Sequence, residues 1–198
     1  SYATVDQLKL SLRAPTSPSA RSWADGEFDA QLERVLATTS ALIDDYCGWP
    51  RGGFNPPADD AAATVRTAEP SPRWRGSAVF TGPISSPDGV VVRTGWGVLA
   101  AADWHWLHPG GPGEAWRHIE LHSPARGPVT VEAVYGWPGG PPGGVVDANL
   151  LWAAHVFKLE SNPLGAEISD FGVVHMSHRP RGIDQLLAPY MRTGAVIA

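Results

Sequence analysis

The sequence has a single cysteine, Cys47, and few charged residues, which make up 18% of its 198 residues. One thiol excludes a disulfide within the chain and any zinc site built from several thiolates. The formal net charge is -5. This balance argues against a dedicated nucleic-acid-binding protein, because such proteins present a basic surface to the phosphates.

Long apolar runs are also missing. No segment approaches the roughly 18 uninterrupted apolar residues that a membrane-spanning helix needs. The N-terminal stretch SYATVDQLKL has no basic region followed by an apolar one, so no secretion signal is expected. We therefore expect a soluble protein that is made in a cytoplasm and has no membrane partner.

Motifs for covalent or nucleotide chemistry are absent. There is no serine-nucleophile motif, and the glycine runs at 110–113 and 139–144 alternate with proline, which is typical of spacers rather than phosphate-binding loops. Cys47 follows a predicted helix, whose dipole raises a thiol pKa at that end, so we interpret it as a small buried residue. The carboxylate pairs 44–45 and 59–60 are interpreted as solvated charge. We therefore expect no catalytic residue, no bound cofactor and no enzyme activity.

The sequence contains seven histidines, which makes a metal-binding site a hypothesis to consider. On a strand, His118 and His122 would share a face, which makes a metal site sterically possible. No carboxylate lies at a matching short spacing and no HExxH motif occurs, so we interpret the histidines as surface residues and expect no metal site. A small metalloenzyme using the pairs within 105–122 remains an alternative. The seven histidines are His105, His108, His118, His122, His155, His175 and His178.

Nine tryptophans are unusual for a chain of this length. Large aromatic rings anchor cores and interfaces, which is the reading we prefer. A glycan-binding module that stacks sugars on these rings is the other alternative. The tryptophans of the central part of the chain include Trp96, Trp104, Trp106 and Trp116.

Helical periodicity is clearest near the two ends of the chain. Residues 27–46 carry one apolar stripe with a period of 3.6, and Gly48 supplies the stop signal. A short helix is predicted after the capping-box pattern at Thr4. Within 27–46 the polar turn 38–40 is interpreted as a half-exposed patch, with a close helix–helix contact as the alternative.

A second long helix is predicted at 145–159, after the proline- and glycine-rich stretch 137–144. It is apolar on most sides and must be covered on most sides, so we expect another subunit to supply part of the cover. A last short helix at 183–191 contains Pro189, which should kink it or end it early. A strand is possible at 171–174.

Between the helical parts, the period changes to two. Residues 64–135 predict five or six short antiparallel strands in a small sandwich or partly open barrel. The fold class is therefore α+β, a core of about four helices with an inserted β domain. The expected parts are an N-terminal helical part at 1–50, a β block at 64–136 and a C-terminal helical part with a docking tail at 145–198.

In the order of its predicted elements, the chain resembles the head–tail connector (adaptor) proteins of long-tailed bacteriophages. Four motifs carry the resemblance: YCGWP at 46–50, the strand–loop–helix stretch at 129–165, FGVV at 171–174 and IDQLLAPYMR at 183–192. With the predicted helix at 27–46 that precedes YCGWP, they give a resemblance that covers most of the chain. The middle, 64–126, is longer and richer in Trp and His than the family pattern.

The resemblance implies a structural virion protein of the neck, assembled in the host cytoplasm. It implies a ring of about twelve copies beneath the portal protein and above a stopper or tail-completion protein. Viral DNA would pass through the lumen without sequence-specific binding, which suits a negatively charged subunit. The C-terminal residues are expected to dock on the portal or on a neighbouring copy. Those residues are Leu186, Leu187, Pro189, Tyr190, Met191, Arg192, Val196 and Ile197.

Overall fold

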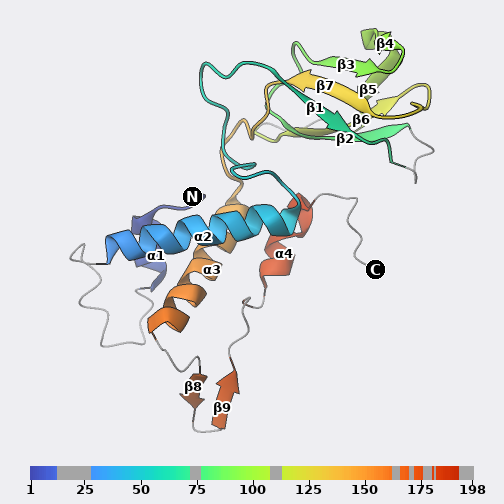
Figure 1. Cartoon of the computed structure of the whole chain (residues 1–198). Helices are drawn as coiled ribbons and strands as arrows, with labels where there is room; N and C mark the ends of the chain where they lie inside the picture. Colours follow the sequence, from blue (N-terminus) through green and yellow to red (C-terminus); the bar gives the residue numbers. More distant parts are fainter. Residues whose placement is uncertain are drawn as a thin grey trace. The chain divides into compact units, whose positions relative to one another are not determined.

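The computed structural model describes residues 1–12, 28–71, 77–107, 113–161, 166–169, 172–175, 180 and 182–191. The chain forms two compact units (Figure 1). The helical unit contains Ser1–Gly52 and Pro142–Met191, and the β unit contains residues 53–141. The predicted α+β class is confirmed. No helix in the described part of the chain is both long enough and apolar enough to cross a bilayer.

The helical unit contains four α-helices in the described residues, where the sequence predicted them. They are α1 (Val5–Leu12), α2 (Asp29–Cys47), α3 (Gly143–Ser161) and α4 (Ile183–Leu187), and α4 continues as the 3-10 turn η4 (Ala188–Tyr190). Pro189 lies in η4, so the change of helix type occurs beside the proline as expected. The predicted strand at 171–174 is present as β9 (Gly172–His175), paired with β8 (Ala166–Ser169).

Local capping sets the ends of the first two helices. Thr4 and Gln7 form the predicted capping box, since the backbone N–H of each donates to the side chain of the other, at 2.8 and 3.2 Å. At the end of α2, Gly48 adopts the left-handed conformation with φ 74°. The N–H groups of Gly48 and Trp49 donate to the carbonyls of Asp45 and Asp44, which completes a Schellman motif.

The apolar stripe of α2 packs against α1 and α3. The buried residues of this core are Ala3, Leu8, Leu32, Val35, Leu36, Ala153 and Phe157. Removing a large aliphatic side chain of this kind from water contributes about 1.5–3 kcal/mol. Several apolar side chains of α3 are buried within its own unit, and Leu151 is a large apolar side chain of this helix that stays 39% exposed.

The polar turn of α2 is a helix–helix contact, so our preferred reading of it as a half-exposed patch is wrong. Thr38 is exposed, but Thr39 and Ser40 are buried. The buried side chain of Asn149 on α3 donates to the hydroxyl of Thr39 at 2.7 Å and to the carbonyl of Leu36 at 3.3 Å. It also accepts from the backbone N–H of Ala3 at 3.1 Å. We call Thr39, Ser40 and Asn149 the polar seam.

The β unit is a sandwich of two antiparallel sheets. One sheet has the order β1-β7-β3-β4 and the other β2-β6-β5. The strands are β1 (Thr64–Ala68), β2 (Ala78–Ile84), β3 (Val91–Thr94), β4 (Gly97–Val98), β5 (Trp104–Trp106), β6 (Trp116–Leu121) and β7 (Val129–Ala133). The extra strand beyond the five or six expected is β4, which is too short to show a period.

The core of the sandwich follows the alternation predicted from the sequence. In β7, Val129, Val131 and Ala133 are buried while the residues between them are half-buried. The same core includes Val92 from β3 and Ile119 from β6, so both sheets contribute to it. This arrangement agrees with a sandwich, with side chains of the two inner faces in contact.

The polar seam predicts a large effect of one substitution. Asn149→Ala should lower the free energy of unfolding of the helical unit by about 2–4 kcal/mol, because the Ala3 N–H and the Thr39 hydroxyl would lose a buried partner. Urea unfolding followed by circular dichroism at 222 nm reports on the helices. Thr38→Ala is the matched control, since this exposed hydroxyl bonds only within its own helix, to the Arg34 carbonyl at 2.9 Å. Equal midpoints for both variants would contradict a stabilising seam.

Candidate partner-docking site

The predicted docking residues begin in α4 and η4, which pack on α3. Leu187 is fully buried, so its side chain belongs to the core of the helical unit rather than to a surface. Leu186, Tyr190 and Met191 are half-buried and Pro189 is exposed. The remaining predicted residues, Arg192, Val196 and Ile197, lie outside the described residues. Among the predicted docking residues that the structure describes, Pro189 is therefore the exposed one, on the outer side of η4.

The end of α2 holds α4 and η4 in place through two hydrogen bonds. The Tyr46 hydroxyl donates to Oδ1 of Asp184 at 2.6 Å. The indole Nε1 of Trp49 donates to the backbone carbonyl of Tyr190, also at 2.6 Å. Both donors belong to the YCGWP motif at 46–50, and both acceptors belong to the IDQLLAPYMR motif at 183–192. Two motifs that are far apart in the sequence therefore form one structural feature.

Gly144 allows this close packing at the start of α3. A Cβ atom at this position would lie 3.1 Å from Cε2 of Tyr190 and 3.2 Å from the carbonyl oxygen of Leu186. These separations are shorter than ordinary van der Waals contact, so the glycine is needed for η4 to approach α3. A Cβ atom at the preceding Gly143 would have no neighbour within 4 Å.

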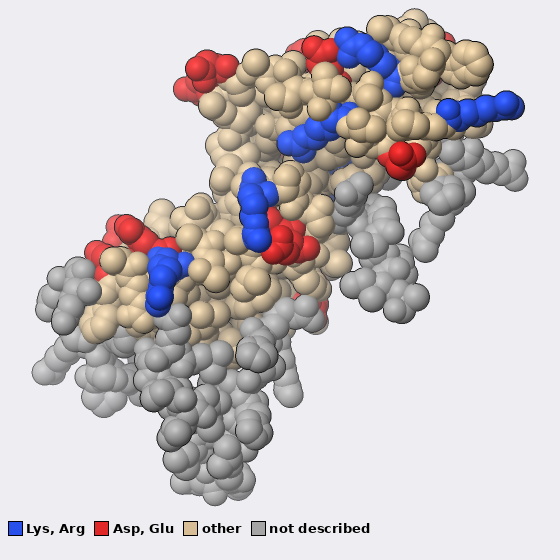
Figure 2. Space-filling model, viewed as in Figure 1, with Lys and Arg blue, Asp and Glu red and all other residues tan. Residues whose placement is uncertain are grey.

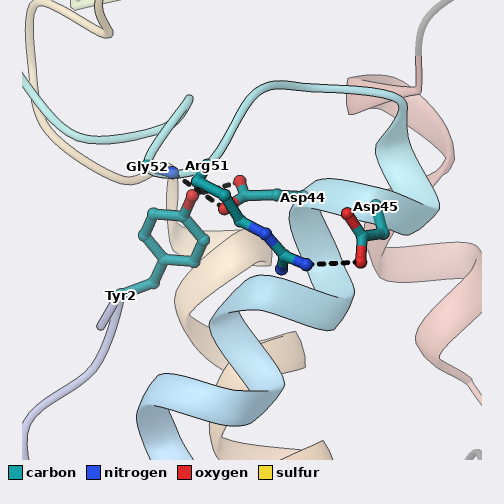
Figure 3. A network of polar contacts seen from close by, with 5 residues as sticks. All are labelled: Tyr2, Asp44, Asp45, Arg51 and Gly52. Carbon is teal, nitrogen blue, oxygen red and sulfur yellow. Dashed lines mark hydrogen bonds and ion pairs between the residues drawn. The ribbon is translucent and has the colours of Figure 1, made fainter.

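Asp44 anchors the end of α2 from the inside (Figure 3). Its carboxylate accepts hydrogen bonds from the Tyr2 hydroxyl and, at 2.9 Å, from the backbone N–H of Gly52. The backbone N–H of Tyr2 donates to Oγ of Ser40 at 3.0 Å. A buried carboxylate is costly unless it is hydrogen-bonded, and here two donors from distant parts of the chain supply the bonds.

The interpretation of the carboxylate pairs 44–45 and 59–60 as solvated charge is wrong for Asp44. Asp44 is only 2% exposed. Its neighbour Asp45 is exposed and pairs with Arg51 at 2.8 Å, a contact that Figure 3 shows beside the buried one. Asp59 and Asp60 are exposed as expected. Adjacent positions on a helix point in different directions, which explains the contrast between Asp44 and Asp45.

Cys47 is buried, as the sequence predicted. Burial and, to a smaller extent, the charge of Asp44 raise the pKa of its thiol to about 12. A thiol with such a pKa is not a nucleophile at neutral pH.

The charged side chains form no single-signed surface on the face that Figure 2 shows. Lys and Arg are interspersed with Asp and Glu over a mostly uncharged surface.

The histidines that lie close together in the structure are not the pair that the sequence spacing suggested. His122 contacts His105 rather than His118, with Nδ1 of His105 and Nε2 of His122 3.1 Å apart. His118 packs edge-on against Phe80, with a distance of 4.9 Å between the ring centroids. In the described part of the chain, no group of three or more His, Cys, Asp or Glu side chains could hold a metal. His108 and His178 lie outside the described residues.

The tryptophans of the β unit are mainly core residues. Trp104, Trp106 and Trp116 are half-buried and pack against the sandwich core. Trp104 and Trp106 meet edge to face, with centroids 5.6 Å apart. Trp96 differs, because it is 86% exposed in the turn between β3 and β4. Among the tryptophans of the β unit that the structure describes, Trp96 is the exposed one.

Sequence reasoning missed Tyr2, Asp44, Trp49 and Asn149 as residues that position the candidate site. Asp44 and Asn149 lie inside α2 and α3, whereas Tyr2 precedes α1 and Trp49 follows α2. For Asp44 and Asn149, the signal that could have revealed them is a polar residue at a position that helical periodicity assigns to the buried face. Their partners lie far away in the sequence, 146 residues apart for Ala3 and Asn149.

The two glycines at the start of α3 provide a matched test of the site. Gly144→Val should force η4 away from α3 and destabilise the packing of α4 by about 1–3 kcal/mol. Hydrogen exchange of the amides of residues 183–190 should then be about tenfold faster or more. Gly143→Val introduces the same side chain into open space and should leave this exchange unchanged. Equal exchange in the two variants would argue against the close contact.

The raised pKa of Cys47 predicts an unreactive thiol. Its thiolate fraction at pH 8 should be about one in ten thousand, because that pH lies some four units below the pKa. In the folded chain, a thiol-specific disulfide reagent should therefore label Cys47 very slowly. In a denaturant the pKa returns to its ordinary value and labelling should be complete within minutes. Rapid labelling without unfolding would contradict the buried position.

Comparison with known proteins yields only structural likenesses. No protein-family profile and no curated protein sequence matches the chain. Two solved structures are similar to it. One is a chain of "Neck of empty GTA particle computed with C6 symmetry", with 18% identity and a TM-score of 0.47, covering 96% of this chain and 89% of that chain. The other is a chain of "Virion of native gene transfer agent (GTA) particle", with 17% identity, a TM-score of 0.48 and the same coverage. Likenesses at this level do not by themselves assign a function.

Proposed function

We propose that this protein is a structural component of the neck of a phage-like particle, an adaptor that forms a ring under the portal protein. In this role it joins the capsid vertex to the tail and lets DNA pass through the ring. The proposal rests on the contact between the motifs at 46–50 and 183–192. In this contact the Trp49 indole donates a hydrogen bond to the backbone carbonyl of Tyr190. These are two of the motifs on which the resemblance to phage adaptors rests.

The architecture supports the same role. The helical unit is assembled from both ends of the chain, and the β unit occupies the interval between them. The resemblance implies this order, a helical core with the β block as an insertion.

Exposed apolar side chains are candidates for contacts within the ring. Leu10 and Leu151 are 65% and 39% exposed in the helical unit. In the β unit, Trp96 and Val98 are 86% and 64% exposed on neighbouring positions of one hairpin. A ring formed by one kind of subunit needs two different complementary surfaces, because each copy contacts the next head to tail. We propose that these side chains contribute to those surfaces.

The proposal is tested by mixing the purified chain with its cognate portal protein. We expect a complex of ring size in mass photometry and a second ring beneath the portal in negative-stain images. The chain alone can be monomeric before docking, because partners of this class often become ordered on binding. Failure to associate with the portal at micromolar concentrations of both proteins would contradict the adaptor role.

The docking residues are tested by a truncation after Met191. This truncation removes Arg192, Val196 and Ile197 but keeps the Tyr190 carbonyl that Trp49 bonds, so the helical unit should unfold at an unchanged urea concentration. Portal binding should be lost, because the proposed contact with the portal or a neighbouring copy is removed. A longer truncation that also removed residues 189–191 would break the hydrogen bond from Trp49 to the Tyr190 carbonyl, so a loss of binding could then result from a loss of folding. Unchanged portal affinity after removal of 192–198 would exclude the tail as the docking segment.

A further inference from the structure

A pair of imidazoles lies on the outer face of the three-stranded sheet of the β unit. In the register of this sheet, Trp104 and Trp106 pair with Leu121 and Ile119, which are core residues. His105, which pairs with Glu120, therefore lies on the opposite face, and its side chain is 52% exposed. His122 follows β6 directly, and its backbone N–H donates to the Asp103 carbonyl at 2.9 Å. This bond fixes His122 beside β5.

The separation of the two rings matches that of two ligands on one metal ion. Nδ1 of His105 lies 3.1 Å from Nε2 of His122, and the ring centroids are 5.3 Å apart. Histidine nitrogens bind zinc at about 2.0–2.1 Å, so two neighbouring ligands on the same ion lie about 3.0–3.4 Å apart. The two nitrogen atoms already have this spacing.

Glu120 supplies the second feature of a histidine metal ligand. Its Oε2 lies 3.4 Å from Nε2 of His105, the ring nitrogen that does not face His122. A carboxylate in this position favours the proton on Nε2 and leaves the lone pair of Nδ1 directed at the shared point between the rings. Histidine ligands are commonly oriented by a carboxylate in this way.

We propose that His105 Nδ1 and His122 Nε2 form a two-nitrogen binding site for a divalent transition metal, with Glu120 as the residue that orients His105. Imidazole suits Cu²⁺, Ni²⁺ and Zn²⁺, and affinity across such ions peaks at Cu²⁺. The protein supplies two nitrogen ligands, so water fills the other positions on the ion. His122 then binds the metal with Nε2 unprotonated and carries its ring proton on Nδ1. The site stands on the geometry of the β unit and does not depend on the proposed adaptor function.

The test uses the full chain purified without an affinity tag and titrated with Cu²⁺ by calorimetry. We expect His105→Gln and His122→Gln each to weaken the strongest binding step at least tenfold. Glu120→Gln should weaken it by about 10–100-fold, as is typical when the partner of a ligand histidine is removed. Electron paramagnetic resonance of the copper complex should show coupling to two nitrogen atoms, reduced to one in either histidine variant.

His118→Gln is the matched control. His118 lies on the same face of the same strand, but its ring contacts Phe80 instead of the pair. Its replacement should leave the affinity and the nitrogen coupling unchanged. The proposal is overturned if the unmodified chain binds no Cu²⁺, or if the His105 and His122 variants bind it as tightly as the His118 variant. All of these side chains lie on the outer face of the sheet, so circular dichroism spectra should be the same for each variant.

Discussion

The structure of the helical unit depends on buried hydrogen bonds along one side of α2. An apolar stripe alone would hold α2 against α3, but it would not fix how the helices slide or rotate relative to each other. Asn149 can satisfy its amide only where Thr39, the Leu36 carbonyl and the Ala3 N–H meet. One turn further along α2, the buried Asp44 accepts hydrogen bonds from Tyr2 and Gly52. Because an unpartnered buried polar group is costly, these contacts select one arrangement of the elements.

The same constraint reaches the candidate docking site through the end of α2. The network around Asp44 and the glycine cap at Gly48 fix where α2 stops, and the next residue, Trp49, bonds the carbonyl of Tyr190. The orientation of α4 and η4 is therefore set by residues that are distant in sequence from any docking surface. Because α4 is short and depends on its tertiary contacts, a test of the proposed docking residues must distinguish loss of binding from loss of this support.

The β unit relies on a different principle, in which apolar burial dominates. Its two sheets share one core, and the tryptophans of β5 and β6 extend that core toward the edge of the smaller sheet. Since the aromatic side chains of β5 face inward, the opposite face of that strand carries histidine. The alternation of a strand thus creates the tryptophan-rich core and the imidazole pair together, and the sequence WHW at 104–106 contains both features.

The sequence by itself determined the elements and their order. Local signals were sufficient for α1 and α2, because the capping box at Thr4 and the glycine stop at Gly48 act within a few residues. Period-two alternation likewise located six of the β-unit strands. It did not predict β4, because a strand of two residues cannot display a period. Only the tertiary structure decided which polar residues are buried and which histidines meet. Asp44 and Asp45 look alike in sequence, and His122 is nearer in sequence to His118 than to His105. The outcome depends on helix packing, which joins Tyr2 to Asp44 across 42 positions, and on strand register, which brings His105 to His122 across 17 positions; neither leaves a local pattern.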